Sequence, residues 1–381
     1  MSKGNTKHNI INVPLNNLGR HVASVRSEVL EAVQRVVDSG WLVLGPETAA
    51  FENMFADYCG VEHCVGVASG SDALELALRS VGCGPGDEIA TVANAGGYAS
   101  LAILATGARP VFIDIDADTL NMSPTSLREK ITTRTKAVVV THLYGRLADV
   151  VSLETVARNA GALIVEDCAQ AHGAQFDGRR AGSFGKAACF SFYPSKNLGA
   201  LGDAGAVVTG DAELAERLRK LRQYGWGKRF QVADPGGRNS RLDELQAAVL
   251  SAQLPRLNGW NKCRRRIVAR YREALSDLNI SFPGREGSSD AYVAHLCVIR
   301  SPQRDRLREE LSMLGIATDI HYPIADYHQI SVKGFSGSTG ALPETERAQS
   351  EIITIPCFPE MTDGEITAVI VAIRQALDNM S

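Results

Sequence analysis

The chain of 381 residues lacks the sequence features that would assign it to a membrane, a nucleic acid or a metal. No apolar stretch approaches the roughly 18 residues that are needed to cross a bilayer. No clustered basic run is present and the net charge is only −3, so nothing marks a nucleic-acid surface. The eight cysteines include no C-x-x-C pair, which disfavours a zinc site and a disulfide framework. We therefore expect no membrane, nucleic-acid or metal partner.

The chain also lacks a recognisable secretory signal, because Met1–His8 is polar and has no apolar core. We therefore expect a cytoplasmic protein. Apolar residues make up 45% of the sequence, and at this length they supply a sizeable core for two domains.

Seven short strand-like runs alternate with amphipathic stretches through the first two thirds of the chain. This alternation predicts an α/β fold with one large, mainly parallel seven-stranded sheet and helices on both of its faces. The runs are Val65–Val67, Glu88–Val92, Val111–Ile113, Ala137–Thr141, Leu163–Val165, Cys189–Phe192 and Ala206–Thr209.

The strand signals disappear from about Leu242 to Ser276, where the pattern is helical. We interpret this stretch as the bridge to a smaller α+β domain. The predicted divisions are residues 31–255 for the large domain and 256–381 for the small C-terminal domain. Residues 1–30 are expected to form an N-terminal segment that packs with the small domain.

An acidic strand end and a lone lysine carry the strongest chemical signal. Asp167 closes one buried strand, and Lys196 lies 29 positions further on, between a second buried run and a Gly-rich loop. Taken singly, each is more often an ordinary strand-end carboxylate or surface lysine. Together they are the pair that a pyridoxal 5'-phosphate (PLP) enzyme needs: an amine to form a Schiff base with the cofactor, and a carboxylate to keep its pyridine nitrogen protonated. A desolvated lysine also loses proton affinity and becomes nucleophilic.

The turn Gly70-Ser71-Asp72 follows a predicted strand and opens a predicted helix. Free backbone N–H groups and the positive end of the helix dipole suit a phosphate at such a position. A plain helix N-cap is the alternative, because Ser and Asp favour that position in any helix. Beside the Asp167 and Lys196 pair, we favour phosphate binding by Gly70, Ser71 and Asp72.

Many ordered blocks of this sequence resemble the DegT/DnrJ/EryC1/StrS sugar aminotransferases, which have the aspartate aminotransferase-like fold (PLP-dependent fold type I). The resemblance covers nearly the whole chain. Its blocks are Leu44–Glu47, Phe51–Glu52, Ala68–Leu74, Pro85–Glu88, His142–Gly145, Glu166–Gly173, the Lys196 loop, Asn239–Ala248, His321–Pro323 and Ile355–Pro356.

The resemblance implies roles for three further residues. Gln170 matches the side chain that contacts the cofactor's phenolic oxygen, and Ser191 matches a serine that contacts its phosphate. Asn239 matches an asparagine that reaches the phosphate in the neighbouring subunit, which implies a homodimer with shared active sites. His172 is less clear, because a histidine before a glycine more often packs or caps. Ordinary turn or backbone bonding remains an alternative for Ser191, Gln170 and Asn239.

The substrate side is defined less sharply. His321 and Tyr322 match the family segment that faces the substrate, although they could equally fill the domain interface. The chain departs from the family at Ala95-Gly96-Gly97-Tyr98, where an aromatic or bulky side chain usually stacks on the cofactor ring. Either Tyr98 supplies that face from a shifted loop, or the small residues leave room for a different substrate. A second departure is Arg146, where the family commonly has Gln.

The resemblance implies an aminotransferase that converts a nucleotide-activated keto sugar to the amino sugar. Glutamate would be the donor, released as 2-oxoglutarate while the cofactor cycles between PLP and its aminated form, PMP. The sequence around Gln170 and Lys196 resembles the branch of the family that acts on C3, and it favours a dTDP-3-keto-6-deoxyhexose as the substrate. Amination at C4 or of a ketocyclitol remains open. So does a non-catalytic PLP-binding regulator, whereas Lys196 argues against a sugar dehydratase of the same family, which has His there.

Overall fold

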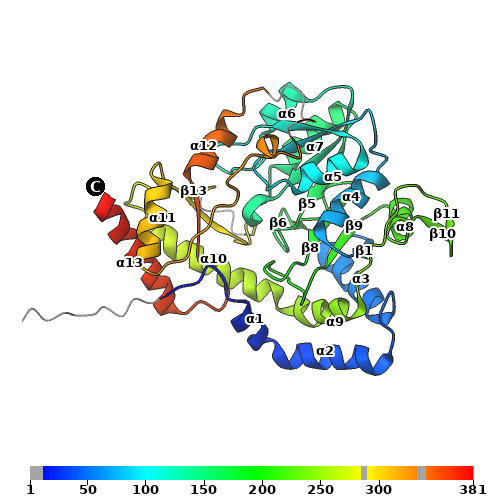
Figure 1. The fold of residues 1–381 in the computed structure, drawn as a ribbon, viewed down its shortest axis with the longest axis horizontal. Helices are drawn as coiled ribbons and strands as arrows, with labels where there is room; N and C mark the ends of the chain where they lie inside the picture. Colours follow the sequence, from blue (N-terminus) through cyan, green and yellow to red (C-terminus); the bar gives the residue numbers. More distant parts are fainter. Residues whose placement is uncertain (1–11, 285–289, 333, 335–339, 381) are drawn as a thin grey trace, which may run out of the picture.

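A single seven-stranded sheet forms the centre of the larger part of the molecule (Figure 1). The structure is a computed structural model that describes residues 12–284, 290–332, 334 and 340–380. The strand order is β1-β9-β8-β5-β4-β2-β3, and β9 is antiparallel to both of its neighbours while the other pairs are parallel. The strands are β1 (His63–Val67), β2 (Glu88–Val92), β3 (Arg109–Ile113), β4 (Thr135–Thr141), β5 (Leu163–Asp167), β8 (Ala187–Ser191) and β9 (Gly205–Thr209). All seven predicted strands are confirmed.

Helices cover both faces of this sheet, because successive side chains along each strand point to opposite sides. In β4, for example, Val139 packs with one helical layer and Val138 with the other. One layer consists of α4 (Gly70–Ser80), α5 (Tyr98–Thr106) and α8 (Ala212–Leu221). The other consists of α3 (Pro46–Cys59), α6 (Pro124–Lys130), α7 (Val150–Asn159) and α9 (Glu244–Gln253).

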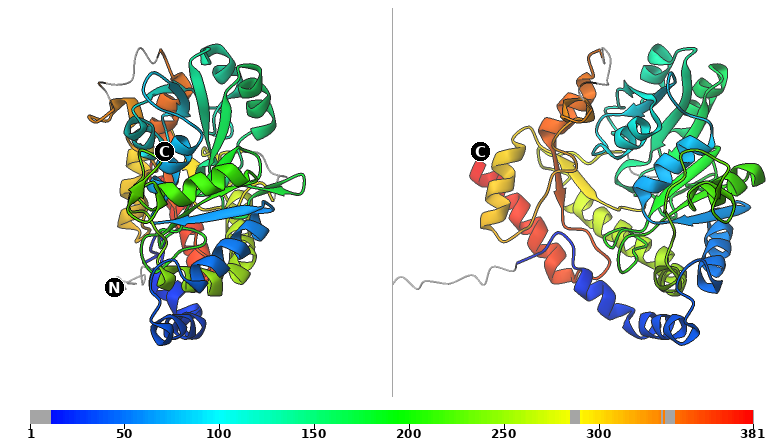
Figure 2. Two further views of the ribbon diagram at one scale, coloured as in Figure 1. Left: turned by 90° about the vertical axis from the view of Figure 1, so that its right-hand side faces the viewer. Right: turned by 45° about the vertical axis from the view of Figure 1, so that its right-hand side comes forward.

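The C-terminal part has a core of its own, formed around a two-stranded antiparallel sheet. The helix α9 continues through a 3₁₀ turn, η2 (Leu254–Arg256), into the long α10 (Leu257–Ala274), which agrees with the predicted helical stretch. Figures 1 and 2 show α9 and α10 running between the large sheet and this second core. Its other elements are β12 (Cys297–Arg300), α11 (Arg304–Met313), η3 (Asp326–His328), α12 (Pro343–Glu351), β13 (Ile352–Ile355) and α13 (Asp363–Met380).

One strand-like segment of the sequence, Ala317–Ile320, forms a single isolated bridge rather than a strand. Asp319 exchanges backbone hydrogen bonds with Thr354 of β13. The Asp319 side chain accepts the N–H of Ile320 at 2.8 Å. The segment leading to His321 is therefore a loop that pairs with β13 at one antiparallel bridge.

The N-terminal segment contacts both parts of the molecule. In α1 (Leu18–Ser24), Arg20 pairs with Glu365 and His21 bonds Glu360, both from the C-terminal part. The next helix, α2 (Arg26–Ser39), packs instead against α9. Residues 1–11 of the predicted segment lie outside the described residues, and the three predicted domain limits stay a proposal.

The remaining elements are a short 3₁₀ turn and two hairpins: η1 (Leu143–Gly145), β6 (Gln175–Phe176) with β7 (Arg179–Arg180), and β10 (Trp226–Lys228) with β11 (Gln231–Val232). Among the described residues, no helix has the length and apolar character that crossing a membrane requires.

Candidate active site

A cavity of about 650 Å³ lies at the carboxyl ends of the central parallel strands. Ligands of open α/β sheets bind at this edge, because the loops after adjacent strands diverge there. Its lining includes nine of the predicted residues: Gly70, Ser71, Tyr98, Asp167, Gln170, Ser191, Lys196, His321 and Tyr322. The structure therefore brings together groups that are up to 252 positions apart in the sequence.

Asp167 is buried at the end of β5. Its carboxylate accepts the N–H of Ala169 at 3.1 Å and the hydroxyl of Thr141 at 3.3 Å. Burial raises the pKa of Asp167, while the bond from Ala169 and the charge of Lys196 act in the opposite direction. Since a carboxylate without an ion-pair partner is costly to bury, the site favours a cationic group against Asp167.

Lys196 lies in the loop after β8. Burial lowers the pKa of its amine to about 8, although the charge of Asp167 partly opposes this shift. The loop is compact: the N–H of Lys196 donates to the carbonyl of Tyr193 at 2.8 Å. A Cβ at Gly199 would lie 2.5 Å from the carbonyl oxygen of Pro194, so a glycine is required to close the turn.

The start of α4 makes a close-fitting cradle beside β8. A Cβ added to Gly70 would lie 2.5 Å from Cβ of Ser191, so only glycine permits this approach. Ser69 caps the helix by accepting the N–H of Asp72 at 3.1 Å. The cradle offers backbone N–H groups of the first turn and the Ser71 and Ser191 hydroxyls to the cavity. This donor set fits a phosphate group.

Two predicted phosphate contacts do not reach this cavity. The carboxylate of Asp72 accepts hydrogen bonds from Arg238 at 3.0 Å and Ser240 at 2.7 Å, which directs it away from the cradle. Asn239 is exposed and does not line the cavity of its own chain. Its backbone instead pairs with Gln223.

Gln170 and Tyr322 meet across the cavity. The Gln170 side-chain oxygen accepts the N–H of Tyr144 at 2.6 Å, and this fixes Nε2 toward the Tyr322 hydroxyl at 3.1 Å. The ring of Tyr98, half exposed at 50%, stands edge-on to Tyr322 with centroids 6.2 Å apart. A Cβ on Gly96 would lie 2.9 Å from the Tyr322 ring. Tyr322 thus occupies space that a larger residue 96 would claim.

The two histidines that the family resemblance singled out, His321 and His172, lie in different places. His321 lines the cavity and its Nδ1 lies 2.9 Å from the Thr354 hydroxyl. His172 is fully buried between Phe190 and Phe192 and does not line the cavity. Burial lowers the pKa of His172 to about 3. The second family departure, Arg146, packs over the Tyr292 ring, away from the cavity.

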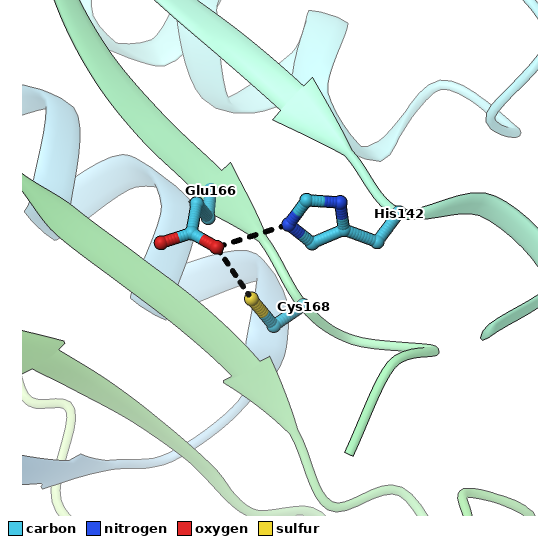
Figure 3. A group of neighbouring side chains, drawn as sticks. All are labelled: His142, Glu166 and Cys168. Carbon is cyan, nitrogen blue, oxygen red and sulfur yellow. Dashed lines mark hydrogen bonds and ion pairs between the residues drawn. The ribbon is translucent and has the colours of Figure 1, made fainter. Parts of the chain in front are cut away.

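A buried group behind Asp167 fixes the ends of β4 and β5 (Figure 3). The Glu166 carboxylate points toward His142, whose Nε2 lies at 3.0 Å, and toward the Cys168 thiol at 3.8 Å. The N–H groups of Gly182, Phe184 and Gly185 also donate to it. Burial would raise the pKa of Glu166, but these bonds lower it. The three side chains could geometrically hold a metal. Because the carboxylate is already saturated with donors, we assign the group a structural role.

His295, which the sequence did not predict as a site residue, is buried and lines the cavity. Its Nδ1 lies 3.0 Å from Oδ1 of Asn197, the neighbour of Lys196. The Asn197 amide nitrogen donates to the carbonyl of Val293 at 3.1 Å, which leaves Oδ1 as an acceptor. Nδ1 of His295 must therefore carry the proton. No local motif announces this contact, since 98 positions separate the two residues.

The family model of the DegT/DnrJ/EryC1/StrS aminotransferases matches residues 23–374. The chain belongs to this family. A dTDP-3-amino-3,4,6-trideoxy-α-D-glucose transaminase of Streptomyces venezuelae is 43% identical over 364 residues, covering 95% of this chain and 96% of that protein. The crystal structure of S. venezuelae DesV with a ketimine intermediate matches with a TM-score of 0.92 and 43% identity, covering 96% of this chain and 98% of that one. NtdA of Bacillus subtilis with bound PMP matches with a TM-score of 0.90 and 28% identity, covering 98% and 86%.

These similarities agree with the geometry of the cavity. The chain is a PLP-dependent aminotransferase of fold type I, as its sequence resemblance implied. The donor set described above fits the cofactor, since it provides a lysine, a buried carboxylate and a phosphate cradle in one cavity. The individual roles of these residues belong to the proposal that follows.

Proposed function

We propose that this enzyme transfers the amino group of glutamate to a nucleotide-activated keto sugar, with a dTDP-3-keto-6-deoxyhexose as the favoured substrate. The observation that carries the proposal is the meeting of Lys196 and Asp167 in one cavity with the Gly70–Ser71 cradle. The similarity to a dTDP-3-amino sugar transaminase supports the choice of sugar. The favoured cellular location is the cytoplasm, where nucleotide sugars would be at hand.

When bound, the cofactor supplies an electron sink for negative charge that develops on the substrate carbon. Lys196 would bond the cofactor's aldehyde through Nζ. Once the donor has displaced it, the freed Nζ would carry a proton to and from the reacting carbon, as a general acid and base. Its pKa of about 8 suits both directions near neutral pH.

The other residues would hold and orient the cofactor. Asp167 would keep the pyridine nitrogen protonated, while Gly70, Ser71 and Ser191 would bind the phosphate. Gln170 would donate from Nε2 to the phenolic oxygen, because the Tyr144 N–H fixes its amide in that orientation. Tyr98, His321 and Tyr322 would contact the sugar from the opposite wall of the cavity.

The two half-reactions provide the test. Mixing the PLP form with glutamate should release 2-oxoglutarate and leave the PMP form, which a keto sugar should then convert back. An enzyme that binds PLP but gives neither half-reaction with any amino donor would be a cofactor-binding regulator. Release of a dehydrated sugar without amination would indicate a dehydratase. Comparison of C3-keto, C4-keto and ketocyclitol substrates decides the remaining alternatives.

We also propose a homodimer in which Asn239 completes the partner's phosphate site. Its exposure and its absence from its own cavity support this arrangement. Chains carrying Lys196→Ala and chains carrying Asn239→Asp, each inactive alone, should recover up to about a quarter of wild-type activity after subunit exchange, since random pairing makes half the dimers mixed with one intact site each. No recovery despite verified exchange would place Asn239 elsewhere.

A further inference from the structure

Arg264 is a buried arginine that faces the cavity without an ion-pair partner. It lies on α10 with 5% of its surface exposed, and it lines the cavity. Its Nη1 donates to the carbonyl oxygens of Cys357 at 2.7 Å and His295 at 3.2 Å. No carboxylate among the described residues pairs with it. The guanidinium therefore carries a charge that no direct ion pair with a described carboxylate neutralises.

The geometry leaves one side of the guanidinium for a ligand. Both hydrogens of Nη1 are directed at backbone carbonyls, which hold the plane of the group. Nε is buried without a partner, and no described residue accepts a hydrogen bond from Nη2. Nη2 is therefore the N–H group of Arg264 that remains for an oxygen of an anionic ligand, and a hydrogen bond between two charged groups is stronger than one between neutral groups.

The nearest acidic groups do not fill this role. Glu360 is close enough to influence Arg264, but it makes no direct ion pair with it: Oε1 of Glu360 lies 2.8 Å from Nδ1 of His21, and Oε2 is buried without a partner among the described residues. Burial lowers the pKa of Arg264, but an arginine remains protonated in proteins. Since an unpaired buried charge is costly, an anionic ligand at this position would be stabilised.

The other basic groups of the cavity lining cannot take the same ligand. Burial holds the pKa of His295 well below its ordinary value and lowers that of His321, so both are neutral at neutral pH. Lys196 faces Asp167 and is committed to the cofactor in the proposed function. Among the described lining residues, Arg264 is therefore the fixed positive charge that remains for a substrate.

We propose that Arg264 binds a carboxylate of the amino donor. This inference rests on the proposed aminotransferase function and deepens it. The cofactor phosphate has its own cradle at Gly70 and Ser71. In a nucleotide sugar the diphosphate is separated from the keto carbon by atoms of the sugar ring. In an amino acid the carboxylate is bonded directly to the reacting carbon, so it must enter the buried end of the cavity. His295 connects the two positions, because its carbonyl accepts a hydrogen bond from Arg264 at 3.2 Å and its Nδ1 lies 3.0 Å from Oδ1 of Asn197, the neighbour of Lys196.

The chain provides a matched control on the same helix. Arg266 lies two residues beyond Arg264 and is exposed, so Arg266→Gln removes the same charge from outside the cavity. Glutarate is the probe, because it carries two carboxylates and no amino group and therefore binds without reacting. Calorimetric titration of the PLP-loaded enzyme measures its affinity, and rapid mixing measures each half-reaction.

Arg264→Gln should weaken glutarate binding and lower kcat/KM for glutamate by roughly ten- to a hundredfold, the loss expected for a charge-assisted hydrogen bond. The reaction of the PMP form with keto sugar should change less than about twofold, and Arg266→Gln should match wild type in all three measurements. Arg264→Lys should retain part of the affinity, because it keeps the charge and loses the planar guanidinium.

Three results would overturn the proposal. One is unchanged glutarate binding in folded Arg264→Gln. Another is a defect confined to the keto-sugar step, which would assign Arg264 to the diphosphate. The third comes from wild-type crystals soaked with glutarate, if the carboxylate density lies away from Arg264, and it does not depend on whether the variants fold. Failure of wild type to react with glutamate would contradict the proposed function instead, while the glutarate titration would still test Arg264.

Discussion

The two walls of the cavity are built in different ways. The sheet wall carries Asp167 and Ser191 at the ends of adjacent strands, with Lys196 in the compact loop that follows. The opposite wall carries His321 and Tyr322 on a loop that joins no strand of the large sheet. Groups that must act in every turnover thus stand on the rigid part of the fold, while groups that face a variable substrate depend on contacts between distant segments.

Asp326 is the contact that holds the second wall in place. Its carboxylate accepts the Gly97 N–H at 2.8 Å and the Ser100 hydroxyl at 2.5 Å, and its own N–H donates to the carbonyl of Ala93. Gly97 precedes α5 and has no side chain to cap it. Asp326 therefore caps α5 from the C-terminal half of the chain and positions the loop that carries Tyr322.

The largest effect is expected on the sheet wall. Asp167→Asn should retain cofactor but lower turnover at least about a hundredfold, because an amide cannot stabilise a charged pyridine nitrogen. Steady-state kinetics at matched cofactor occupancy measure the loss. Near-normal turnover would show that Asp167 does not have its proposed role. It would also contradict the view that the sheet wall carries the groups needed in every turnover.

The pH dependence of cofactor capture tests the burial of Lys196. Only the unprotonated amine is nucleophilic, so the rate at which the apoprotein captures PLP should rise with pH and level off above about 8, the lowered pKa of Lys196. Stopped-flow absorbance follows the reaction. A rate that keeps rising toward the pKa of a free lysine, about 10.4, would show that the sheet wall does not desolvate the amine.

A pair of neighbouring glycines tests the second wall. Gly96 and Gly97 have φ of +82° and +84°, so an alanine is strained at either position. At Gly97 the added Cβ meets nothing within 4 Å, whereas at Gly96 it meets the Tyr322 ring. We expect the strained φ to cost about 1–2 kcal/mol at each position, and Gly96→Ala to lose more because its Cβ displaces the Tyr322 ring. A lower kcat/KM for the keto sugar is expected only in Gly96→Ala. Equal values of kcat/KM for the two variants would show that Tyr322 does not contribute to substrate binding.

The smallest effect on activity is expected at Asp326, where the predicted change is in the pH dependence of stability. Burial raises the pKa of Asp326 to about 7, so between about pH 4 and 7 the folded protein holds a proton that the unfolded chain releases. Its contribution to stability is therefore present at low pH and is lost as the pH rises through about 7. Asp326→Asn and Asp326→Ala should both lack this part of the pH dependence in denaturant unfolding. Asp326→Ala should also lose the cap, so it should be less stable than Asp326→Asn by about 1 kcal/mol at every pH. An unchanged pH profile in Asp326→Asn would contradict the assignment.

The sequence predicted the sheet wall better than the opposite wall, for a physical reason. Strand patterns are local, and a strand end fixes where Asp167 and Ser191 must lie. The roles of His295, Arg264 and Asp326 depend on contacts across 98, 93 and 229 positions, and no local pattern encodes them. Gly70 opens α4 and lines the cavity, yet the Asp72 side chain turns to Arg238, because that partner comes from a distant loop. The departure from the family at Gly96 is explained by the Tyr322 ring, which fills the space that a larger side chain would need.

Borohydride reduction of the PLP-loaded enzyme tests the central claim most directly, because it fixes the cofactor to the lysine that holds it. Peptide mapping should find the label on Lys196, and Lys196→Ala should remain unlabelled while it still folds. The exposed Lys186→Ala variant serves as a control and should label normally. Label on any other lysine of the wild-type enzyme would contradict the account.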